Sequence, residues 1–338
     1  MATITCFGEL LLRLTAPGRE RLLQTLALDV HVGGAEANVA VSLSRFGHQA
    51  SMVGVVPDNP LGAAARAELS RHGVDVSRVR SGDGRMGLYF LEQGAILRPS
   101  EVTYDRAGSA FAIADPAGYD WGTLLAGAQW LHLSGVTPAL GERTAQAAIA
   151  AATMARQMGV RVSFDGNFRP KLWRQWRGDA PAILRELMGR AQIVFADYRD
   201  ITVVLGREFA QTDPFARVDA AAHAAFEAFP QLEVMACTHR TPHSVDHHTL
   251  SAQLCRRDGA SVHAGSLDVA GIVDRIGGGD AFAAGLLHGL IENMADSDAL
   301  TFALAAAVCK HSLPGDFNLV SAAEVRSIAE ANGFDVRR

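Results

Sequence analysis

Short apolar runs alternate along the chain with longer segments in which apolar residues recur every three or four positions. The short runs predict buried strands at 2–7, 50–56, 129–133, 161–165, 193–196 and 232–237. The longer segments predict helices at 35–46, 61–72, 142–158 and 219–229, and then at 281–292, 298–310 and 322–332. Strands alternating with helices are typical of a mainly parallel sheet covered by helices, so we predict an α/β fold.

Two stretches interrupt this alternation, at about 10–34 and 86–108. Both contain short runs rich in Leu, Tyr and Val, which predict strands that pair into a small separate sheet. We expect this sheet to be a lid inserted into one domain that spans residues 1–338. Since its edges would expose unpaired backbone groups, we also expect a homo-oligomer, either a dimer through the lid or a higher assembly.

Composition and charge narrow the class of protein. The 338 residues are 49% hydrophobic and 20% charged, with a formal net charge of −5. This balance argues against a dedicated nucleic-acid or anionic-membrane surface. No apolar run is long enough to span a membrane, and no basic leader precedes the first strand, so we expect a cytoplasmic protein. The four cysteines lack Cys-x-x-Cys spacing, which favours buried thiols over a disulfide framework or a zinc site.

The most informative motif lies at 274–285, where Gly277, Gly278, Gly279 and Asp280 stand before an alanine-rich helical segment. Glycines leave backbone N–H groups accessible, and a helix N-terminus favours an anion. A carboxylate beside such a site can act as a general base toward a hydroxyl. Taken alone, the motif is equally compatible with a loop whose Asp280 caps the helix.

A second glycine motif, Gly33-Gly34-Ala35-Glu36-Ala37-Asn38, opens an earlier helix. Its glycines would let a polar ligand approach the backbone, and Asn38 offers hydrogen-bond donors and an acceptor, although close helix packing would explain the glycines equally simply. The chain lacks Gly-x-x-x-x-Gly-Lys-Ser/Thr, Gly-x-Gly-x-x-Gly after its first strand, and the protein-kinase motifs. A Walker-type ATPase and a dinucleotide oxidoreductase therefore lose support.

In this order, the two motifs resemble those of the PfkB, or ribokinase-like, carbohydrate kinases over nearly the whole chain. The resemblance implies a three-layer αβα sandwich with a β-sheet lid, and it implies ATP and Mg²⁺ as cofactors, with a monovalent cation as a further candidate. It makes Asp280 the general base and the backbone of Gly277, Gly278 and Gly279 an anion hole. It places Asp274 and Gly277 to Gly279 beside the nucleotide. Gly278 stands where the family usually has Ala, which we interpret as a mild change.

Within the family, segments 33–38, 132–140 and 165–173 are most similar to kinases of 2-keto-3-deoxygluconate. The guanidinium of Arg169 can bind a substrate carboxylate through two parallel hydrogen bonds, and Arg106 is a second candidate cation. The resemblance adds a set of substrate contacts: Gly33, Gly34, Ala35, Asn38, Tyr89, Tyr104, Arg106 and Asp316. Without it, the two tyrosines are more simply packing residues of half-buried strands, and Asp316 is equally well a turn residue.

Residues on the nucleotide side depart further from the family pattern. The resemblance places Asn167 near the phosphates, and Asp200 near Mg²⁺ through water, where the family has Asn-x-x-Glu. Segment 237–248 lacks the family's Lys-x-Gly-x-x-Gly, so we predict a nucleotide loop in which Arg240 supplies the positive charge. Four histidines lie there (His239, His243, His247 and His248) without a carboxylate or cysteine at ligand spacing, which favours polar surface over a metal site.

The resemblance, together with these residues, implies a kinase that transfers the γ-phosphate of ATP to the C6 hydroxyl of 2-dehydro-3-deoxy-D-gluconate, a small-molecule sugar acid. Two alternatives stay open. One is the same chemistry on fructose, ribose or 2-dehydro-3-deoxygalactonate. The other is a sugar- or nucleotide-binding regulator that has lost catalysis, which the altered segment around Arg240 would explain.

Overall fold

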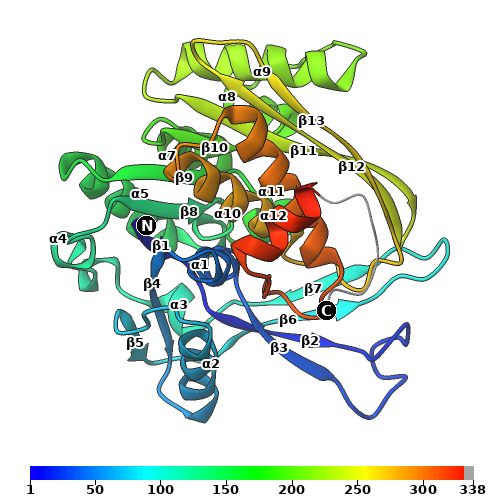
Figure 1. The fold of residues 1–338 in the computed structure, drawn as a ribbon. Helices are drawn as coiled ribbons and strands as arrows, with labels where there is room; N and C mark the ends of the chain where they lie inside the picture. The colour runs from blue at the N-terminus through cyan, green and yellow to red at the C-terminus, as the bar shows by residue number, and fades with distance from the viewer. Residues whose placement is uncertain (331–338) are drawn as a thin grey trace.

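A twisted nine-stranded sheet forms the centre of the computed structural model, which describes residues 1–330 (Figure 1). Its strand order is β13-β12-β11-β10-β9-β8-β1-β4-β5. The strand bounds are β1 Thr3–Phe7, β4 Gln49–Pro57, β5 Val79–Gly82, β8 Trp130–Ser134, β9 Arg161–Asp165, β10 Ile193–Phe195, β11 Val234–Ser244, β12 His247–Arg256 and β13 Val262–Ala270. All six predicted central strands are present, so the α/β prediction is confirmed.

The sheet is parallel from β5 to β11 and antiparallel beyond it. The prediction of a loop at 237–248 is wrong, because these residues form most of the β11–β12 hairpin. Its outer half extends past the helical layers and is exposed, so the run lacks the hydrophobicity of a buried strand. Pro242 also lowers strand propensity, and it lies at a break in the register, where proline is tolerated.

Helices cover both faces of the sheet, as Figure 1 shows. One face carries α1 Ala35–Arg45, α2 Pro60–Arg71, α10 Gly278–Ile291, α11 Asp296–His311 and α12 Ala322–Glu330. The other carries α3 Ala110–Ile113, α4 Trp121–Leu124, α5 Glu142–Gln157, α6 Pro170–Trp176, α7 Ala180–Met188, α8 Tyr198–Leu205 and α9 Pro214–Ala228. The predicted three-layer αβα sandwich is therefore confirmed, with one apolar core on each side of the sheet.

Helix boundaries follow local capping chemistry. The side chain of Asn59 accepts hydrogen bonds from the N–H groups of Leu61 and Gly62, and Pro60 opens α2. Helix α9 begins five residues earlier than we predicted, because Asp213 caps it and Pro214 occupies its first position. The predicted end of the last helix, at 332, lies outside the described residues.

A separate four-stranded sheet lies below the main body in Figure 1. Its order is β3-β2-β6-β7, with β2 Leu11–Thr15, β3 Asp29–Gly33, β6 Gly87–Glu92 and β7 Glu101–Asp105. It has its own small apolar cluster of Leu11, Tyr89 and Leu91. The predicted small sheet is confirmed, whereas its closure over a substrate as a lid stays a prediction.

Two further observations concern the chain as a whole. Cys6, Cys237, Cys255 and Cys309 are all buried and unpaired, as their spacing predicted. No helix within residues 1–330 is both long enough and apolar enough to cross a membrane.

Candidate functional site

The two glycine motifs meet at the N-terminal ends of α1 and α10, which pack against each other. The side-chain amide of Asn38 donates a 2.6 Å hydrogen bond to Oδ2 of Asp280, and the two residues are 242 positions apart in the chain. Both side chains are buried. The fold therefore brings together the two residue types that the sequence singled out, a carboxylate and a polar amide, at one point between two helix N-termini.

The late glycine turn begins the helix earlier than expected. Gly277 is the N-cap, with φ of 82°, and Gly278 and Gly279 are the first two residues of α10. Asp280 is thus the third helical residue, so the alternative in which it caps the helix is wrong. Within residues 1–330, the N–H groups of Gly277, Gly279 and Asp280 have no hydrogen-bond partner, whereas Gly278 donates to the carbonyl of Arg275.

Two of these glycines are required by their surroundings. A Cβ at Gly277 would lie 2.1 Å from the carbonyl oxygen of Asp316, and one at Gly278 would lie 2.8 Å from the ring of His311. An alanine at Gly278 would therefore require the ring of His311 to move, and whether the replacement of the family's Ala is a mild change stays a prediction. Gly279 is exposed, a Cβ there would meet open space, and its N–H has no partner within residues 1–330, so it is available to a ligand.

Asp280 has the electrostatics of a base tuned to neutral pH. Burial raises its pKa to about 7, and the carboxylates of Glu36 and Asp316 act in the same direction. The hydrogen bond from Asn38 opposes this rise by stabilising the ionised form, and so does the nearby guanidinium of Arg169. A carboxylate with a pKa near 7 can both exist ionised and accept a proton effectively at physiological pH.

Replacing Asn38 by Ala should raise the pKa of Asp280 further. The lost donor is a hydrogen bond to a charged group, worth about 1.5–3 kcal/mol, so the acid limb of the kcat/KM profile should shift by about one pH unit or more. The shift should be toward higher pH, because more base is needed to ionise the carboxyl. The pH dependence of kcat/KM measures it.

Asn59→Ala is the matched control, since that asparagine caps α2 away from the site. It should lower stability slightly and leave the pH profile in place. An unchanged acid limb in Asn38→Ala would contradict the assignment of that limb to Asp280.

Two further carboxylates lie near this site, Asp165 at the carboxyl end of β9 and Asp200 in the first turn of α8, after the neighbouring strand β10. Burial raises the pKa of Asp165 well above its usual range, and Asp280 and Asp200 add to the rise. Burial and Asp197 raise the pKa of Asp200 to about 6. Asp200 also accepts a 3.0 Å hydrogen bond from the N–H of Asp197, in the capping box of α8. Asp165 therefore lies within the field of two other carboxylates, and such a group of oxygens suits a divalent cation such as Mg²⁺.

Asn167 and Arg169 lie in the turn that follows β9. Asn167 has φ of 38°, a left-handed conformation that asparagine adopts readily, and its N–H donates to Oδ1 of Asp165. Arg169 is exposed, and the one hydrogen bond of its guanidinium within the described chain is a long 3.4 Å contact with the carbonyl of Phe168. Its guanidinium is therefore available to an anionic ligand close to Asp280.

The small sheet contributes a buried ion network. Nη2 of Arg13, on β2, lies 2.5 Å from Oδ2 of Asp274, and its Nε lies 3.2 Å from Oδ1 of Asp316. The phenol of Tyr89, on β6, donates to Oδ2 of Asp316 at 2.7 Å. The other oxygen of Asp274 accepts from the N–H of Ile276. Both oxygens of Asp274 are thus engaged within the protein, and its contact with a nucleotide stays a prediction.

Other predicted substrate residues line the same region. Arg106 is buried, and its Nε donates to Oε2 of Glu9 at 2.5 Å. Tyr104 is half-buried and pairs with Tyr89 across β6 and β7, with the ring centroids 6.4 Å apart. Gly33 approaches Asp316 so closely that a Cβ there would lie 2.3 Å from Oδ2. The structure therefore gathers most of the predicted substrate residues around Asp280 and Asp316.

Arg240 lies on β11, within the field of Arg275, which precedes the glycine turn. Burial lowers its pKa, and the guanidinium groups of Arg275 and Arg199 lower it further. Mutual repulsion of this kind would be relieved by a polyanion. A nucleotide polyphosphate fits these residues, and Arg240 in that role stays a prediction.

The four histidines of this hairpin do not behave alike. His248 is buried, and burial together with Arg240 and Arg275 lowers its pKa to about 4, so the prediction of polar surface is wrong for it. Asp268 of β13 also approaches His247, with 2.6 Å between its Oδ1 and Nε2. A carboxylate partner therefore exists that the local spacing did not reveal, because it comes from a neighbouring strand.

Sequence reasoning missed Arg13, Glu9, Asp165 and Lys310. For two of them a signal was present. Arg13 interrupts the apolar run Leu10-Leu11-Leu12 to Leu14, where a charge would need a buried partner. Lys310 ends an alanine-rich helical segment just before Pro314-Gly315-Asp316.

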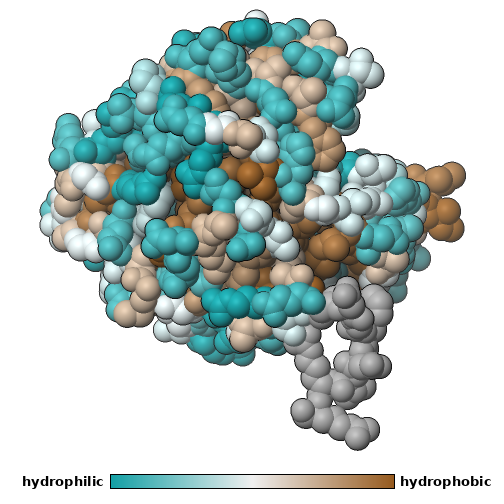
Figure 2. All heavy atoms as spheres, turned by 45° about the horizontal axis from the view of Figure 1, so that its top comes forward, coloured by the Kyte–Doolittle hydropathy of each residue, from teal (hydrophilic) through white to brown (hydrophobic). Residues whose placement is uncertain are grey.

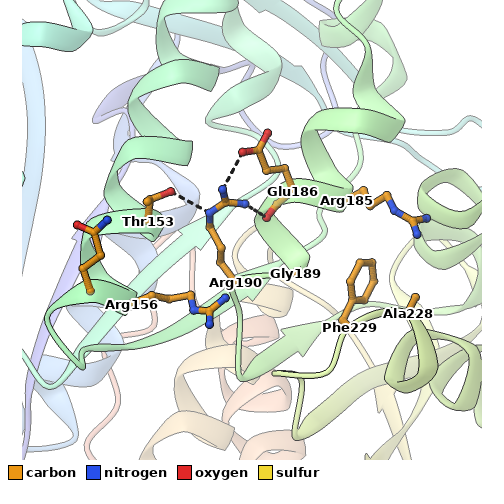
Figure 3. Close-up of a pocket in the computed structure, with 9 residues that line it drawn as sticks. Thr153, Arg156, Arg185, Glu186, Gly189, Arg190, Ala228 and Phe229 are labelled. Carbon is orange, nitrogen blue, oxygen red and sulfur yellow. Dashed lines mark hydrogen bonds and ion pairs between the residues drawn. The ribbon is translucent and has the colours of Figure 1, made fainter.

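A concavity of about 570 Å³ lies elsewhere (Figure 3). It is formed where α5, α7 and α9 end, beside Arg156, Arg185 and Arg190, and Arg190 is held there by Thr153 and Glu186. Ligands of open α/β sheets bind at the carboxyl ends of the strands, whereas this hollow is at the opposite edge. It is therefore not the candidate site.

Known proteins share both the sequence pattern and the fold. The model of the pfkB family of carbohydrate kinases matches residues 1–321. The 2-dehydro-3-deoxygalactonokinase of Haloferax volcanii is 31% identical, covering 100% of this chain and 99% of the relative. The crystal structure of 2-dehydro-3-deoxygluconokinase from Thermotoga maritima is 35% identical, covers 98% of this chain and 100% of that one, and superposes with a TM-score of 0.92.

Proposed function

Because this chain belongs to the pfkB family of carbohydrate kinases, we propose that it transfers the γ-phosphate of ATP to the C6 hydroxyl of 2-dehydro-3-deoxy-D-gluconate. The observation that carries the proposal is the contact between Asn38 and Asp280, which joins the two glycine motifs in one buried site. Helix N-termini, accessible N–H groups and a carboxylate with a pKa near 7 are what phosphoryl transfer to an alcohol requires.

In the proposed reaction, Asp280 accepts the proton of the C6 hydroxyl. The oxygen forms a bond to the γ-phosphorus as the bond from that phosphorus to the bridging oxygen of ADP breaks. The N–H groups of Gly277 and Gly279, which have no partner within residues 1–330, would donate to the phosphoryl oxygens as negative charge develops on them. Arg240 and Arg275 hold the nucleotide phosphates. The products are ADP and the 6-phosphorylated sugar acid.

Magnesium fits the carboxylates beside this site. Asp200 and Asp165 would hold it through their oxygens, directly or through water. When bound, Mg²⁺ neutralises phosphate charge and orients the phosphates. Asn167 lies in a left-handed turn next to Asp165, and its side-chain amide would bind the same phosphates.

The acidic substrate is supported by Arg169, an exposed cation near the base. Arg169→Ala should raise KM for 2-dehydro-3-deoxygluconate by about 10- to 100-fold, since a charge-assisted contact contributes about 1.5–3 kcal/mol. Steady-state kinetics with the sugar acid and with a neutral sugar check this, because only the acid should be affected.

Arg174→Ala is the control, because Arg174 is an exposed arginine of the adjacent helix α6. It should leave KM unchanged for both substrates. Equal losses for the acid and the neutral sugar in Arg169→Ala would mean that this side chain does not recognise the carboxylate.

Release of ADP with a panel of acceptors tests the function itself. The panel contains 2-dehydro-3-deoxygluconate, 2-dehydro-3-deoxygalactonate, fructose and ribose, and the highest kcat/KM should belong to the first. The Haloferax volcanii relative is named for the galactonate, so a preference for that acceptor would keep the chemistry and change the substrate. Binding without ADP release from any acceptor would instead favour the non-catalytic regulator.

A dimer through the small sheet is supported by apolar residues at its tips. Leu23 and Leu26, between β2 and β3, and Ile96 and Leu97, between β6 and β7, are almost fully exposed. Figure 2 shows hydrophobic atoms projecting at the right edge, where the β6–β7 connection projects in Figure 1. Exposed apolar side chains of this kind mark an association surface, and sedimentation at micromolar concentration tests the dimer.

A further inference from the structure

Lys310 is an unusual buried charge directly behind the glycine turn. Its side chain is fully buried at the end of α11. Its Nζ donates to two main-chain carbonyls, that of Leu313 at 2.8 Å and that of Asp274 at 3.4 Å. A Cβ placed at Gly277 would lie 3.3 Å from its Cε. The ammonium therefore connects the segment that leads into the turn with the segment that leads to Asp316.

Burying a lysine is unfavourable unless the charge is compensated. Within residues 1–330 no carboxylate forms an ion pair with Nζ, and its hydrogen-bond partners are neutral carbonyls. Burial lowers the pKa of Lys310 to about 8, while Asp274, Asp316 and Asp280 act against that decrease. The group thus stays largely protonated at neutral pH, held by carboxylates that it does not touch.

The remaining charges show what this cation balances. Arg13 forms ion pairs with Asp274 and Asp316, whereas no cation among residues 1–330 forms an ion pair with Asp280. Asp280 must be ionised to act as a base, and a phosphoryl group brought to the turn adds more negative charge. A compact positive charge beneath the turn would favour both.

The composition gives a second, independent indication. The chain has 31 lysines and arginines, and only Lys171 and Lys310 are lysines. An ammonium is a compact donor that fits between two carbonyls, whereas a planar guanidinium requires a wider site. A methionine or leucine would fill the same space without the penalty of a buried charge.

We propose that Lys310 is a positioning residue for phosphoryl transfer, an internal cation that holds the Asp274–Gly277 turn in place and stabilises negative charge at the N-terminus of α10. Lys310 does not reach the substrate, since its side chain is fully buried. Its effect passes through the turn that it supports and through the field of its charge. This inference rests on the proposed kinase function.

The deciding variant is Lys310→Gln, which keeps an N–H donor for the carbonyls and removes the charge. We expect kcat to fall by about 100-fold, the loss typical of removing one electrostatic contact to a transition state. Affinity for ADP with aluminium fluoride, a mimic of the transferring phosphoryl group, should fall by a similar factor in calorimetry. Affinity for ADP alone should stay the same.

Lys310→Ala adds a rescue experiment. It leaves a small cavity lined by the carbonyls of Asp274 and Leu313, and methylammonium should restore part of kcat in a saturable manner. A residue that only filled space would not respond to an added cation. If Lys310→Ala does not fold, Lys310→Gln alone decides, by kcat and by binding of the mimic.

Lys171→Met removes the only other lysine, which is exposed, and should keep wild-type kinetics and binding. Wild-type kcat in Lys310→Gln, or equal loss of ADP and of the mimic, would overturn the inference. These outcomes can be distinguished from a failure of the proposed kinase function. In that case the wild-type protein itself would release no ADP with any sugar acid.

Discussion

Asp280→Asn should lower kcat by about 10²- to 10⁴-fold, the usual contribution of a general base. The amide keeps the size of the side chain, and its oxygen can still accept the hydrogen bond from Asn38, so substrate and nucleotide should bind nearly as before. Steady-state kinetics and calorimetry together separate the loss of turnover from a loss of binding.

The same variant should also unfold at a higher temperature at pH 8. Burial raises the pKa of Asp280 to about 7, so folding favours its protonated form. That stabilisation is complete below pH 4, where the unfolded carboxyl is also protonated, and it is lost as the pH rises from about 4 to about 7. The neutral amide avoids this loss, so melting curves should show a larger difference between variant and wild type at pH 8 than at pH 5.

Asp298→Asn is a control for both measurements, because Asp298 is an exposed acid in the first turn of α11. It should change neither kcat nor the pH dependence of melting. Retention of most of the activity in Asp280→Asn would exclude the general-base role, and the raised pKa would then be only a consequence of burial.

Arg13→Met should lower the free energy of unfolding by about 3–5 kcal/mol. The guanidinium is buried between Asp274 and Asp316, and its removal leaves two buried carboxylates without their cation. Burial by itself would lower the pKa of Arg13, but Asp316 and Asp274 raise it above its ordinary value. Urea denaturation of the wild type and the variant measures the change.

The variant should affect catalysis as well. Arg13 joins the small sheet to the glycine turn, and burial would raise the pKa of Asp316 further without it. We therefore expect a higher KM for the sugar acid. Arg85→Met is the control, because Arg85 pairs with Asp105 on the exposed side of the same sheet. Such surface pairs contribute about 0–1 kcal/mol, and an equal loss in both variants would contradict the role of Arg13.

Much of the fold followed from local patterns. Alternating apolar runs and helical segments identified the six central strands, and the interruptions at 10–34 and 86–108 identified the small sheet. The part of the β11–β12 hairpin beyond residue 237 was missed. Its strands are stabilised by pairing with each other and, for β12, with β13, rather than by their own hydrophobicity. Its exposed outer half has the composition of a loop.

Parts of the site followed in the same way. Glycines before a helix indicate accessible N–H groups wherever they occur, so the turns at Gly33 and Gly277 could be found from the sequence. The sequence could not show which of the glycines in the second turn are needed for packing. A Cβ at Gly277 would contact Asp316 and one at Gly278 would contact His311, and both of these residues are distant in the chain. Of the three glycines at 277–279, only Gly279 would have open space around an added Cβ.

The sequence by itself determined the layered α/β architecture, the two glycine turns and the residue types available for phosphoryl transfer, since these depend on neighbours within a few positions. Only the tertiary structure decided which charges belong together. Arg13 pairs with Asp274 across 261 positions, and Lys310 lies behind a turn that begins 36 positions earlier. Buried charges are stable only beside specific partners, and the partners are brought together by the packing of the whole chain.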